Sequence, residues 1–284
     1  MTIRANTLRA TARLKFETRH AWESAVATVR GNGITAYWYR DVLNFGDLIT
    51  PLLLRHYGFT PVYDRPNRAR LVAAGSVLEH LRNDYAGIIL GSGFIEEKSR
   101  MNFPQARVLA VRGALTRERM GCGPEVALGD PGLLASRVLL LREPKKFALG
   151  IVPHHSEKSN LCYAQLATKH PKDITIIHVE RQPLDVFRHI DQCEHILSSS
   201  LHGLIVADSL GIPNGWLASK DLWGGRFKFD DYYSALDIRA DGAVPEGNET
   251  VPELLALATA KPGDKIESLK ERLHQLWTKM GSYR

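Results

Sequence analysis

A serine-rich turn followed by a histidine carries the clearest chemistry in this sequence. Three serines follow an apolar run that should form a strand, and His202 falls in the first turn of the helix expected next. The hydroxyls and the first free N–H groups of that helix would form a cradle for an anion. A helix N-terminus favours the neutral imidazole, so His202 is suited to exchange protons near neutral pH, unless it merely caps a backbone carbonyl. The serines are Ser198, Ser199 and Ser200.

Arg112 is the second candidate, because it ends a predicted strand and Gly113 after it opens a helical stretch. A guanidinium in this place can hold a carboxylate or a phosphate through two parallel hydrogen bonds. The alternative is that Arg112 pairs with Asp130 or another carboxylate across the sheet edge. The Gly-Asp-Pro run at 129–131 is interpreted as a turn first and as part of a site second.

Small residues follow three further predicted strands, where they allow a backbone to approach a bound molecule closely. Asp47 is the expected N-cap of a helix that starts at Leu48, and a plain turn without a ligand is the alternative for its loop. The Gly-Ser-Gly run at 91–93 begins like a dinucleotide-binding loop, but Glu96 interrupts that fingerprint, so no nicotinamide or flavin site is expected. The candidate binding residues of these loops are Asn44, Gly46, Asp47, Ser76, Gly91, Ser92 and Gly93.

His154 and His155 lie just past a later predicted strand. Two histidines without an HxxE or HExxH partner are too few for a metal site, so we expect no metal and no cofactor. Either imidazole is instead a candidate contact for phosphate.

Short β-branched or apolar runs alternate with segments of helical period, which indicates a parallel α/β architecture. The charged stretch at 142–146 separates two such sets, so we predict two Rossmann-like lobes whose strand ends share a cleft. A final helix from about Asp264 to Met280 would by analogy pack back on the first lobe. The expected strands are 34–39, 71–74, 88–90, 108–111, 126–128, 147–152, 174–178, 195–197 and one near Trp216. The expected units are an extension over 1–33, lobes over 34–143 and 144–220, and a C-terminal segment over 221–284.

The composition suits a folded protein, since 284 residues with 44% hydrophobic content can bury a full core. The sequence has no apolar run of about 18 residues and no secretory signal, which favours a cytoplasmic protein. Three scattered cysteines are expected to be reduced core thiols. A net charge of +6 favours an anionic partner, whether a phosphorylated metabolite, a lipid surface or nucleic acid.

Residues 1–30 carry six Arg and Lys side chains against two glutamates. A basic amphipathic helix lying on an anionic membrane is one interpretation. The apolar face is short and broken, which favours the other interpretation, a docked or frayed extension.

Taken in order, these motifs resemble those of the polysaccharide pyruvyl transferases over residues 34–235, with the succinoglycan-type, ketal-forming branch closest. The resemblance implies a fold similar to that of the GT-B glycosyltransferases, with phosphoenolpyruvate between the lobes and no nucleic acid as partner. The pyruvyl group would pass to two sugar hydroxyls of an exopolysaccharide or surface-glycan intermediate, whether or not that acceptor is lipid-linked. The motifs are Asn44–Asp47, Gly75–Ser76, Gly91–Gly93, Val111–Gly113 with Thr116, Gly129–Pro131, Pro153–His154 and Ser199–Gly203.

By this resemblance His202 would be the acid that protonates the enol carbon, and Arg112 with the serines would stabilise carboxylate and phosphate charge. Some members carry an arginine where this chain has Ser200, which leaves one anion contact unassigned. Lys228, His154 and Arg226 are candidates for that contact. Two rival functions stay open: a GT-B glycosyltransferase that uses a nucleotide sugar, and a non-catalytic subunit that binds a glycan or lipid surface.

Overall fold

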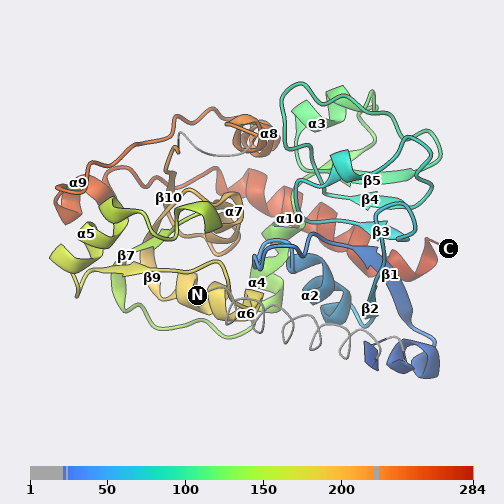
Figure 1. The fold of residues 1–284 in the computed structure, drawn as a ribbon, viewed down its shortest axis with the longest axis horizontal. Coiled ribbons are helices and arrows are strands. Elements are labelled where there is room, and N and C mark those ends of the chain that lie inside the picture. The colour runs from blue at the N-terminus through green and yellow to red at the C-terminus, as the bar shows by residue number, and fades with distance from the viewer. Residues whose placement is uncertain (1–21, 24, 220–223, 284) are drawn as a thin grey trace, which may run out of the picture.

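The computed structural model describes residues 22–23, 25–219 and 224–283. These residues form two parallel β-sheets, each with its own helices, which lie side by side in Figure 1. The α/β class with two Rossmann-like lobes is therefore confirmed, while the likeness to GT-B enzymes and the domain boundaries stay predictions. Most of the basic extension (1–21 and 24) and residues 220–223 of the C-terminal segment lie outside the described part. Neither interpretation of the extension is tested.

The first sheet contains six parallel strands in the order β2-β1-β3-β4-β5-β6. Strand β2 is absent from the strands predicted by the sequence, because Pro61 interrupts its apolar run. Proline is tolerated in a strand at a sheet edge, and β2 occupies the edge. The strands are β1 (Gly33–Tyr37), β2 (Thr60–Tyr63), β3 (Leu71–Val72), β4 (Ile88–Leu90), β5 (Arg107–Val111) and β6 (Ala127–Leu128).

The second sheet has the parallel order β10-β9-β7-β8. In both sheets the second strand lies on one side of the first and the third strand lies on the other. Such a reversal opens a crevice beyond the carboxyl ends of the strands, where ligands of open α/β sheets bind. The crevices follow β1 and β3 in one lobe and β7 and β9 in the other. The strands are β7 (Phe147–Val152), β8 (Ile174–Ile176), β9 (Cys193–Ser198) and β10 (Asn214–Trp216).

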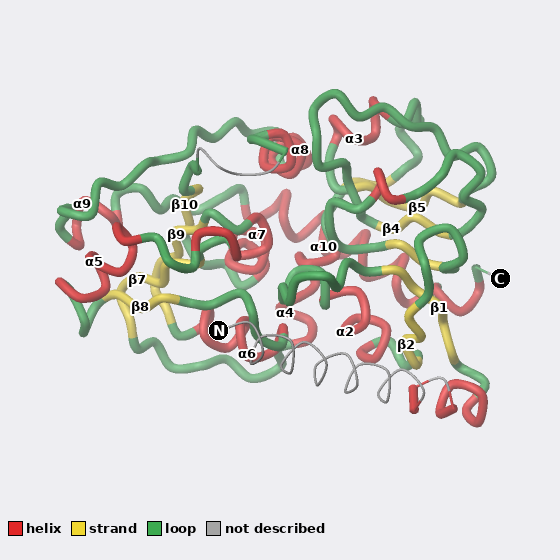
Figure 2. The backbone as a smooth tube through the Cα atoms, in the orientation of Figure 1, coloured by secondary structure: helices red, strands yellow, loops and turns green. Residues whose placement is uncertain are grey.

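Figure 2 shows the helices distributed around both sheets. None of the described helices is long and apolar enough to cross a membrane. The α-helices are α2 (Ile49–His56), α3 (Ala114–Arg119), α4 (Ala135–Val138), α5 (Leu161–Lys169), α6 (Pro183–Asp191), α7 (Leu201–Ser209), α8 (Phe227–Ala235), α9 (Val251–Leu255) and α10 (Gly263–Thr278). Short 3₁₀ turns are η1 (Leu78–His80), η2 (Pro131–Leu134), η3 (His155–Glu157) and η4 (Met280–Ser282).

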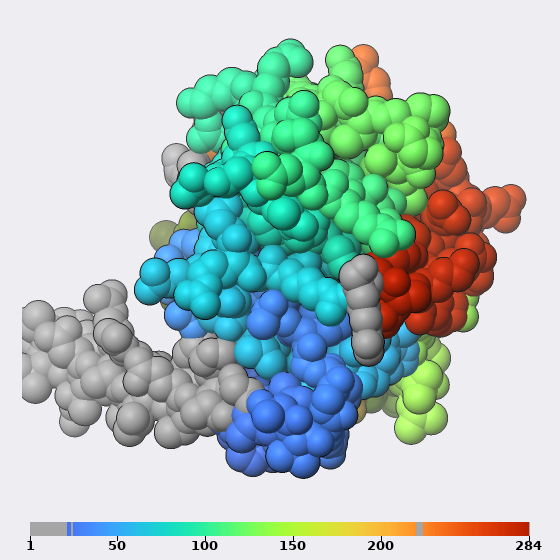
Figure 3. Space-filling view, turned by 90° about the vertical axis from the view of Figure 1, so that its right-hand side faces the viewer, coloured from blue at the N-terminus to red at the C-terminus, as the bar shows by residue number. Residues whose placement is uncertain are grey.

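Helix α10 joins the two lobes. Its buried side chains, among them Leu269, Leu273 and Trp277, recur at helical spacing, and the helix contacts β6 of the first sheet and α7 of the second lobe. It therefore packs on both lobes, where the sequence-based expectation named the first alone. In Figure 3 the C-terminal residues, in red, lie against the blue and green residues of the first lobe. One apolar cluster runs through both lobes, so their relative position is fixed by a shared core.

All three cysteines are free thiols, as expected. Cys193 is buried, whereas Cys122 and Cys162 are partly exposed, so the expectation of core thiols holds for one of the three. Burial raises the pKa of the Cys193 thiol to about 12, which keeps it protonated and unreactive.

Candidate active site

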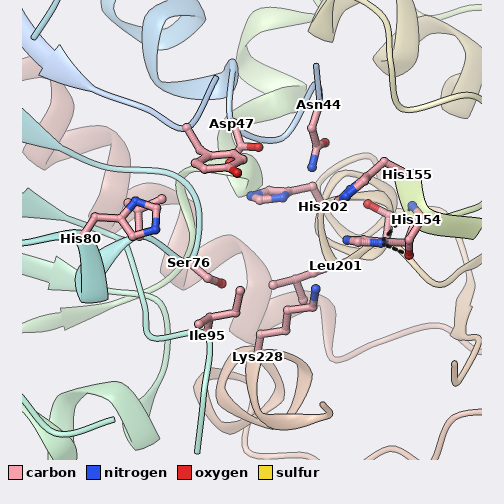
Figure 4. A pocket seen from close by; sticks show the side chains of 14 residues that line it. Asn44, Asp47, Ser76, His80, Ile95, His154, His155, Leu201, His202 and Lys228 are labelled. Atoms are coloured by element: carbon pink, nitrogen blue, oxygen red, sulfur yellow. Dashed lines mark hydrogen bonds between the residues drawn. The ribbon is translucent and has the colours of Figure 1, made fainter. Parts of the chain in front are cut away.

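A cavity of about 180 Å³ lies where the crevices of the two sheets meet (Figure 4). This volume is below the roughly 300–1,000 Å³ of sites for drug-sized ligands, so the cavity suits a small metabolite. Both lobes supply its walls from loops that follow the central strands. The lining residues are Tyr39, Asn44, Asp47, Ser76, Val77, His80 and Ile95 from the first lobe, and His154, His155, Ser156, Ser200, Leu201, His202 and Lys228 from the rest of the chain.

The loop after β1 turns sharply to bring two polar side chains to the cavity. The Asn44 side chain accepts a hydrogen bond from the Gly46 amide (3.1 Å), and the Phe45 amide donates to the carbonyl of Val179 in the second lobe (2.9 Å). The expected N-cap role of Asp47 is wrong, because the cap position of α2 is Leu48 and no side chain caps it. Asp47 lines the cavity instead, and its side chain has no hydrogen-bond partner among the described residues.

The serine turn before α7 supplies one hydroxyl to the cavity, not three. The Ser198 hydroxyl donates to the carbonyls of Val152 (2.9 Å) and Ser200 (2.7 Å), and Ser199 Oγ accepts from the His154 amide (2.9 Å). Both serines therefore fix the turn and do not line the cavity. Ser200 lies at the cavity wall, at the N-terminus of α7, where the helix dipole favours an anion.

His202 is buried at the floor of the cavity. The ring is clamped by the loop after β1: a Cβ atom added to Gly46 would lie 2.2 Å from Nδ1, 2.5 Å from Cγ and 2.8 Å from Cε1. These distances place the Gly46 backbone against the Nδ1 side of the ring, so only glycine fits at this position. Burial lowers the pKa of His202, while the neighbouring Asp130 carboxylate opposes that shift. The lowered pKa favours the neutral imidazole, and its main cause is burial.

The two ring nitrogens of His202 differ in their surroundings. Nε2 is sealed from solvent and has no hydrogen-bond partner in the part of the chain that the structure describes. It lies 3.7 Å from Oδ2 of Asp130, which is sealed and unpartnered in the same sense. Nδ1 likewise makes no hydrogen bond to a described residue, but it is not sealed. The imidazole therefore has one nitrogen that can exchange a proton with a ligand and one that faces a buried carboxylate.

Lys228 projects from α8 into the cavity and is only 7% exposed. No acceptor for its ammonium group is found among the described residues. The pKa of Lys228 is lowered to about 8. The main cause is burial, the positive charge of Arg112 adds to it, and the negative charge of Asp47 opposes it. A cation held in this way, without a partner, needs an anion from solution.

Asp47 faces the same space as Lys228. Burial raises the pKa of its carboxyl to about 7, against the attraction of Lys228 and with the Asp130 charge adding to the rise. A carboxyl with a pKa near neutrality can either give or take a proton at physiological pH.

Arg112 does not reach the cavity as a free anion clamp. The side chain is fully buried, Nε donates to Oδ2 of Asp231 (2.8 Å), and the other two nitrogens donate to Ser76 Oγ and the Phe94 carbonyl. The alternative considered for Arg112, an ion pair inside the protein, is therefore the one observed, with Asp231 in place of Asp130. Because Asp231 also accepts from the amide and hydroxyl of Thr116 (2.7 Å each), this cluster holds α8, and with it Lys228, against the first lobe.

Replacing Arg112 by alanine is expected to lower the free energy of unfolding by about 3–5 kcal/mol, because the Asp231 charge would remain buried without its partner. Urea denaturation of the wild-type protein and of Arg112→Ala measures this. Wild-type stability together with lost anion binding would instead restore Arg112 as a direct ligand.

The Gly-Ser-Gly loop after β4 supports the site from behind and does not line the cavity. Ser92 donates to the carbonyl of Gly75 (2.7 Å), which ties the loops after β3 and β4 together. Gly93 is required because an added Cβ would lie 2.5 Å from the Arg112 guanidinium carbon. Gly91 has φ of +98°, and its added Cβ would meet the Gly129 carbonyl at 2.8 Å.

Part of the first-lobe wall of the cavity is aromatic. Tyr39 and His80 line it, with ring centroids 5.7 Å apart. His80 Nδ1 lies 2.5 Å from the hydroxyl of Tyr37, whose pKa is raised by burial, so this hydroxyl stays protonated. If the hydroxyl donates to Nδ1, the proton of His80 is on Nε2, which is then a fixed hydrogen-bond donor.

His154 and His155 close the second-lobe side of the cavity with ring centroids 4.0 Å apart. Burial, Lys228 and the His155 ring lower the pKa of His154 to about 3, so its imidazole is neutral. Arg226, the remaining candidate for an anion contact, pairs with Asp230 (2.8 Å) and does not line the cavity. Among the described residues no group of three or more His, Cys, Asp or Glu side chains is arranged to hold a metal ion.

Comparison with known proteins identifies the family. The family model of the polysaccharide pyruvyl transferases matches residues 37–221, which is more than half of the chain and includes the loops of both lobes. The chain belongs to the polysaccharide pyruvyl transferase family. This confirms the family predicted from the motifs.

Two relatives support the assignment. The succinoglycan biosynthesis protein ExoV of Rhizobium meliloti is 29% identical over 210 residues, which cover 71% of this chain and 64% of that protein. An uncharacterized protein of Acanthamoeba polyphaga mimivirus is 30% identical over 166 residues, 54% of this chain and 56% of its own. The matched regions span less than two thirds of the length of either relative.

Proposed function

We propose that this cavity transfers the pyruvyl group of phosphoenolpyruvate to two hydroxyls of one sugar of an exopolysaccharide or surface-glycan intermediate, with a cyclic ketal as product. The observation that carries the proposal is the buried ammonium of Lys228, which has no hydrogen-bond acceptor among the described residues. It shares a small cavity with the α7 N-terminus and with an imidazole that makes no hydrogen bond to a described residue. Phosphoenolpyruvate carries the two anionic groups that such a site attracts, and its enol carbon needs the proton that His202 can deliver.

Phosphoenolpyruvate would bind on the side of the cavity that Lys228 and the N-terminus of α7 line. Its phosphate and carboxylate would bind Lys228, Ser200 and the first amides of α7, with His154 as a neutral contact. These charges counteract the burial that lowers the pKa of His202, so donor binding is coupled to proton uptake by the imidazole. The proposal thereby explains how a histidine that is neutral in the free protein becomes an acid in the complex.

Two groups carry the protons of the proposed reaction. His202 gives its proton to C3 of the enol, and a first sugar hydroxyl attacks the cationic C2 while Asp47 accepts the hydroxyl proton. The C2–O bond to phosphate then breaks, and the phosphate takes the proton from Asp47. The second hydroxyl attacks C2 and returns its proton to His202. One hydroxyl proton thus ends in the new methyl group and the other on phosphate, so the protein is regenerated.

The aromatic wall suits the acceptor. Tyr39 offers a ring face to a sugar, and Nε2–H of His80 offers a hydrogen bond to a hydroxyl. Asp47 lies on the loop that follows Tyr39, close to where an acceptor hydroxyl would be activated.

Ligand-induced thermal stabilisation tests the donor. Phosphoenolpyruvate is expected to raise the melting temperature in a concentration-dependent manner, while uridine diphosphate sugars leave it unchanged. The reverse result would favour a nucleotide-sugar glycosyltransferase. Stabilisation by neither ligand, together with binding of glycan alone, would favour a non-catalytic subunit.

Donor affinity is expected to fall as the pH rises from 7 to 9. Lys228 is charged below its pKa of about 8 and loses that charge above it, while Asp47 becomes negative above its pKa of about 7. Both changes disfavour an anion, so they act in the same direction. Calorimetric titration with phosphoenolpyruvate at constant ionic strength measures the trend, and Lys228→Arg, which stays charged, should bind more evenly across this range. Affinity that increases between pH 7 and 9 would contradict the assignment of the anion to Lys228.

A further inference from the structure

Asp130 and His202 are brought together from different lobes. Asp130 follows β6 of the first sheet, whereas His202 stands in the first turn of α7 in the second lobe. Their facing atoms, Asp130 Oδ2 and His202 Nε2, are 3.7 Å apart and sealed from solvent, and neither has a hydrogen-bond partner within residues 22–23, 25–219 and 224–283. Unpaired buried polar atoms are costly, so such a pair calls for a functional explanation.

The rest of the Asp130 carboxylate is already committed. Oδ1 accepts a hydrogen bond from the Gly132 amide (2.8 Å), which caps the turn η2 and fixes the plane of the carboxylate. Oδ2 is thereby held facing the imidazole. At 3.7 Å the two groups are too far apart for a hydrogen bond, but a shift of about 1 Å of the imidazole towards the carboxylate would form one.

We propose that Asp130 is the positioning residue of His202: in the working state it accepts a hydrogen bond from Nε2–H and so keeps Nδ1 as the nitrogen that carries the transferred proton. Asp130 itself touches no substrate, because it lies behind the cavity wall. This inference rests on the proposed function for its catalytic meaning, but not for its geometry.

The variant Asp130→Asn gives a sharp test, because it preserves size and can preserve the cap. With its oxygen still bound to the Gly132 amide, the asparagine would present its NH₂ group to Nε2. Nε2 would then become the acceptor, and the proton would move to Nδ1. The structure therefore predicts an Nε2–H tautomer in the wild-type protein and an Nδ1–H tautomer in Asp130→Asn.

Nitrogen-15 NMR of histidine-labelled protein reads the tautomer directly, with the signals of His202 assigned by their loss in His202→Gln. With phosphoenolpyruvate and a glycan preparation from the producing cells, kcat of Asp130→Asn should fall by about 100-fold, while calorimetry shows donor affinity within a few-fold of wild type. A wild-type Nδ1–H tautomer, or a variant with unchanged tautomer and unchanged kcat, would overturn the inference.

The NMR measurement needs no substrate, so its result does not depend on the proposed reaction. An Nε2–H tautomer in a protein that does not use phosphoenolpyruvate would reject the proposed function and retain the Asp130–His202 pair. Urea denaturation of Asp130→Asn serves as the control, since a stability close to wild type shows that the cap at Gly132 persists.

Discussion

His202→Asn is expected to lower turnover by about 10²–10⁴-fold while phosphoenolpyruvate still binds, because the variant removes the group that gives a proton to the enol carbon. Donor binding should persist because Lys228 and the N-terminus of α7 remain. Initial rates of phosphate release, measured with acceptor present, give the turnover, and calorimetry gives the affinity.

A matched control for this variant is His178→Asn. His178 is an exposed histidine of the second lobe and does not line the cavity. Its replacement should leave both quantities near wild type. If the His202 variant turned over at nearly the wild-type rate, His202 would have no part in the chemistry.

Lys228→Met is expected to weaken phosphoenolpyruvate binding by about 10- to 100-fold, the size of a lost charge-assisted hydrogen bond. The same change should stabilise the protein in the absence of ligand. Burial lowers the pKa of Lys228 from 10.5 to about 8, which corresponds to about 3 kcal/mol against the charged form. Removing the charge therefore relieves a cost that the folded protein bears below pH 8, and the relief fades as the pH rises above 8.

The two effects of Lys228→Met have opposite signs, and this separates a binding role from a structural one. Thermal melts without ligand give the stability, and calorimetric titration gives the affinity. The matched control is Arg226→Met, which removes a cation two residues earlier that is exposed and paired with Asp230. A Lys228 variant that is both less stable and unchanged in binding would show that the ammonium serves the fold.

The loops of the site could be predicted well from the sequence, because in a parallel α/β protein the loops that form a site follow the strands. The sequence predicted less well which side chains of a loop reach the cavity. Ser198 ends β9 and turns inward to the backbone, whereas Ser200, two residues later, opens the helix and lies at the wall. The direction of the Ser198 side chain depends on a hydrogen bond to the carbonyl of Val152, which is distant in the sequence. The residues of the turn alone do not reveal it.

Arg112 shows a second limit of reading the sequence. Its position at a strand end fits an anion clamp, but the carboxylate that takes it, Asp231, comes 119 residues later on a helix of the C-terminal segment. Only the tertiary structure shows that Asp231 pairs with the arginine and that Lys228, one helical turn earlier, lines the cavity. The sequence named Lys228 as one of three candidates and had no means of choosing it.

Tyr39 and His80 were not predicted as site residues, and Asp130 was predicted as part of a turn first and of a site second, for related reasons. Asp130 has a sufficient local role in its turn, which hides its second role beside an imidazole from the other lobe. Tyr39 and His80 belong to no motif, and they meet because β1 and β3 are neighbours in the sheet although β2 separates them in sequence. The strand order indicates both residues, because the loops after β1 and β3 lie beside the same crevice and must line it.

The central claim is that one cavity joins a phosphoenolpyruvate-derived carbon to sugar hydroxyls. Its most direct test uses phosphoenolpyruvate labelled with carbon-13 at C2. The protein is incubated with this donor and with a glycan preparation from the producing cells in deuterated water. The glycan is then analysed by NMR, and the released phosphate is assayed. We predict a labelled ketal carbon on the glycan, a methyl group that has gained deuterium, and one phosphate released per ketal. Phosphate release without labelled glycan, or labelled glycan in which the enol remains intact, would contradict the account.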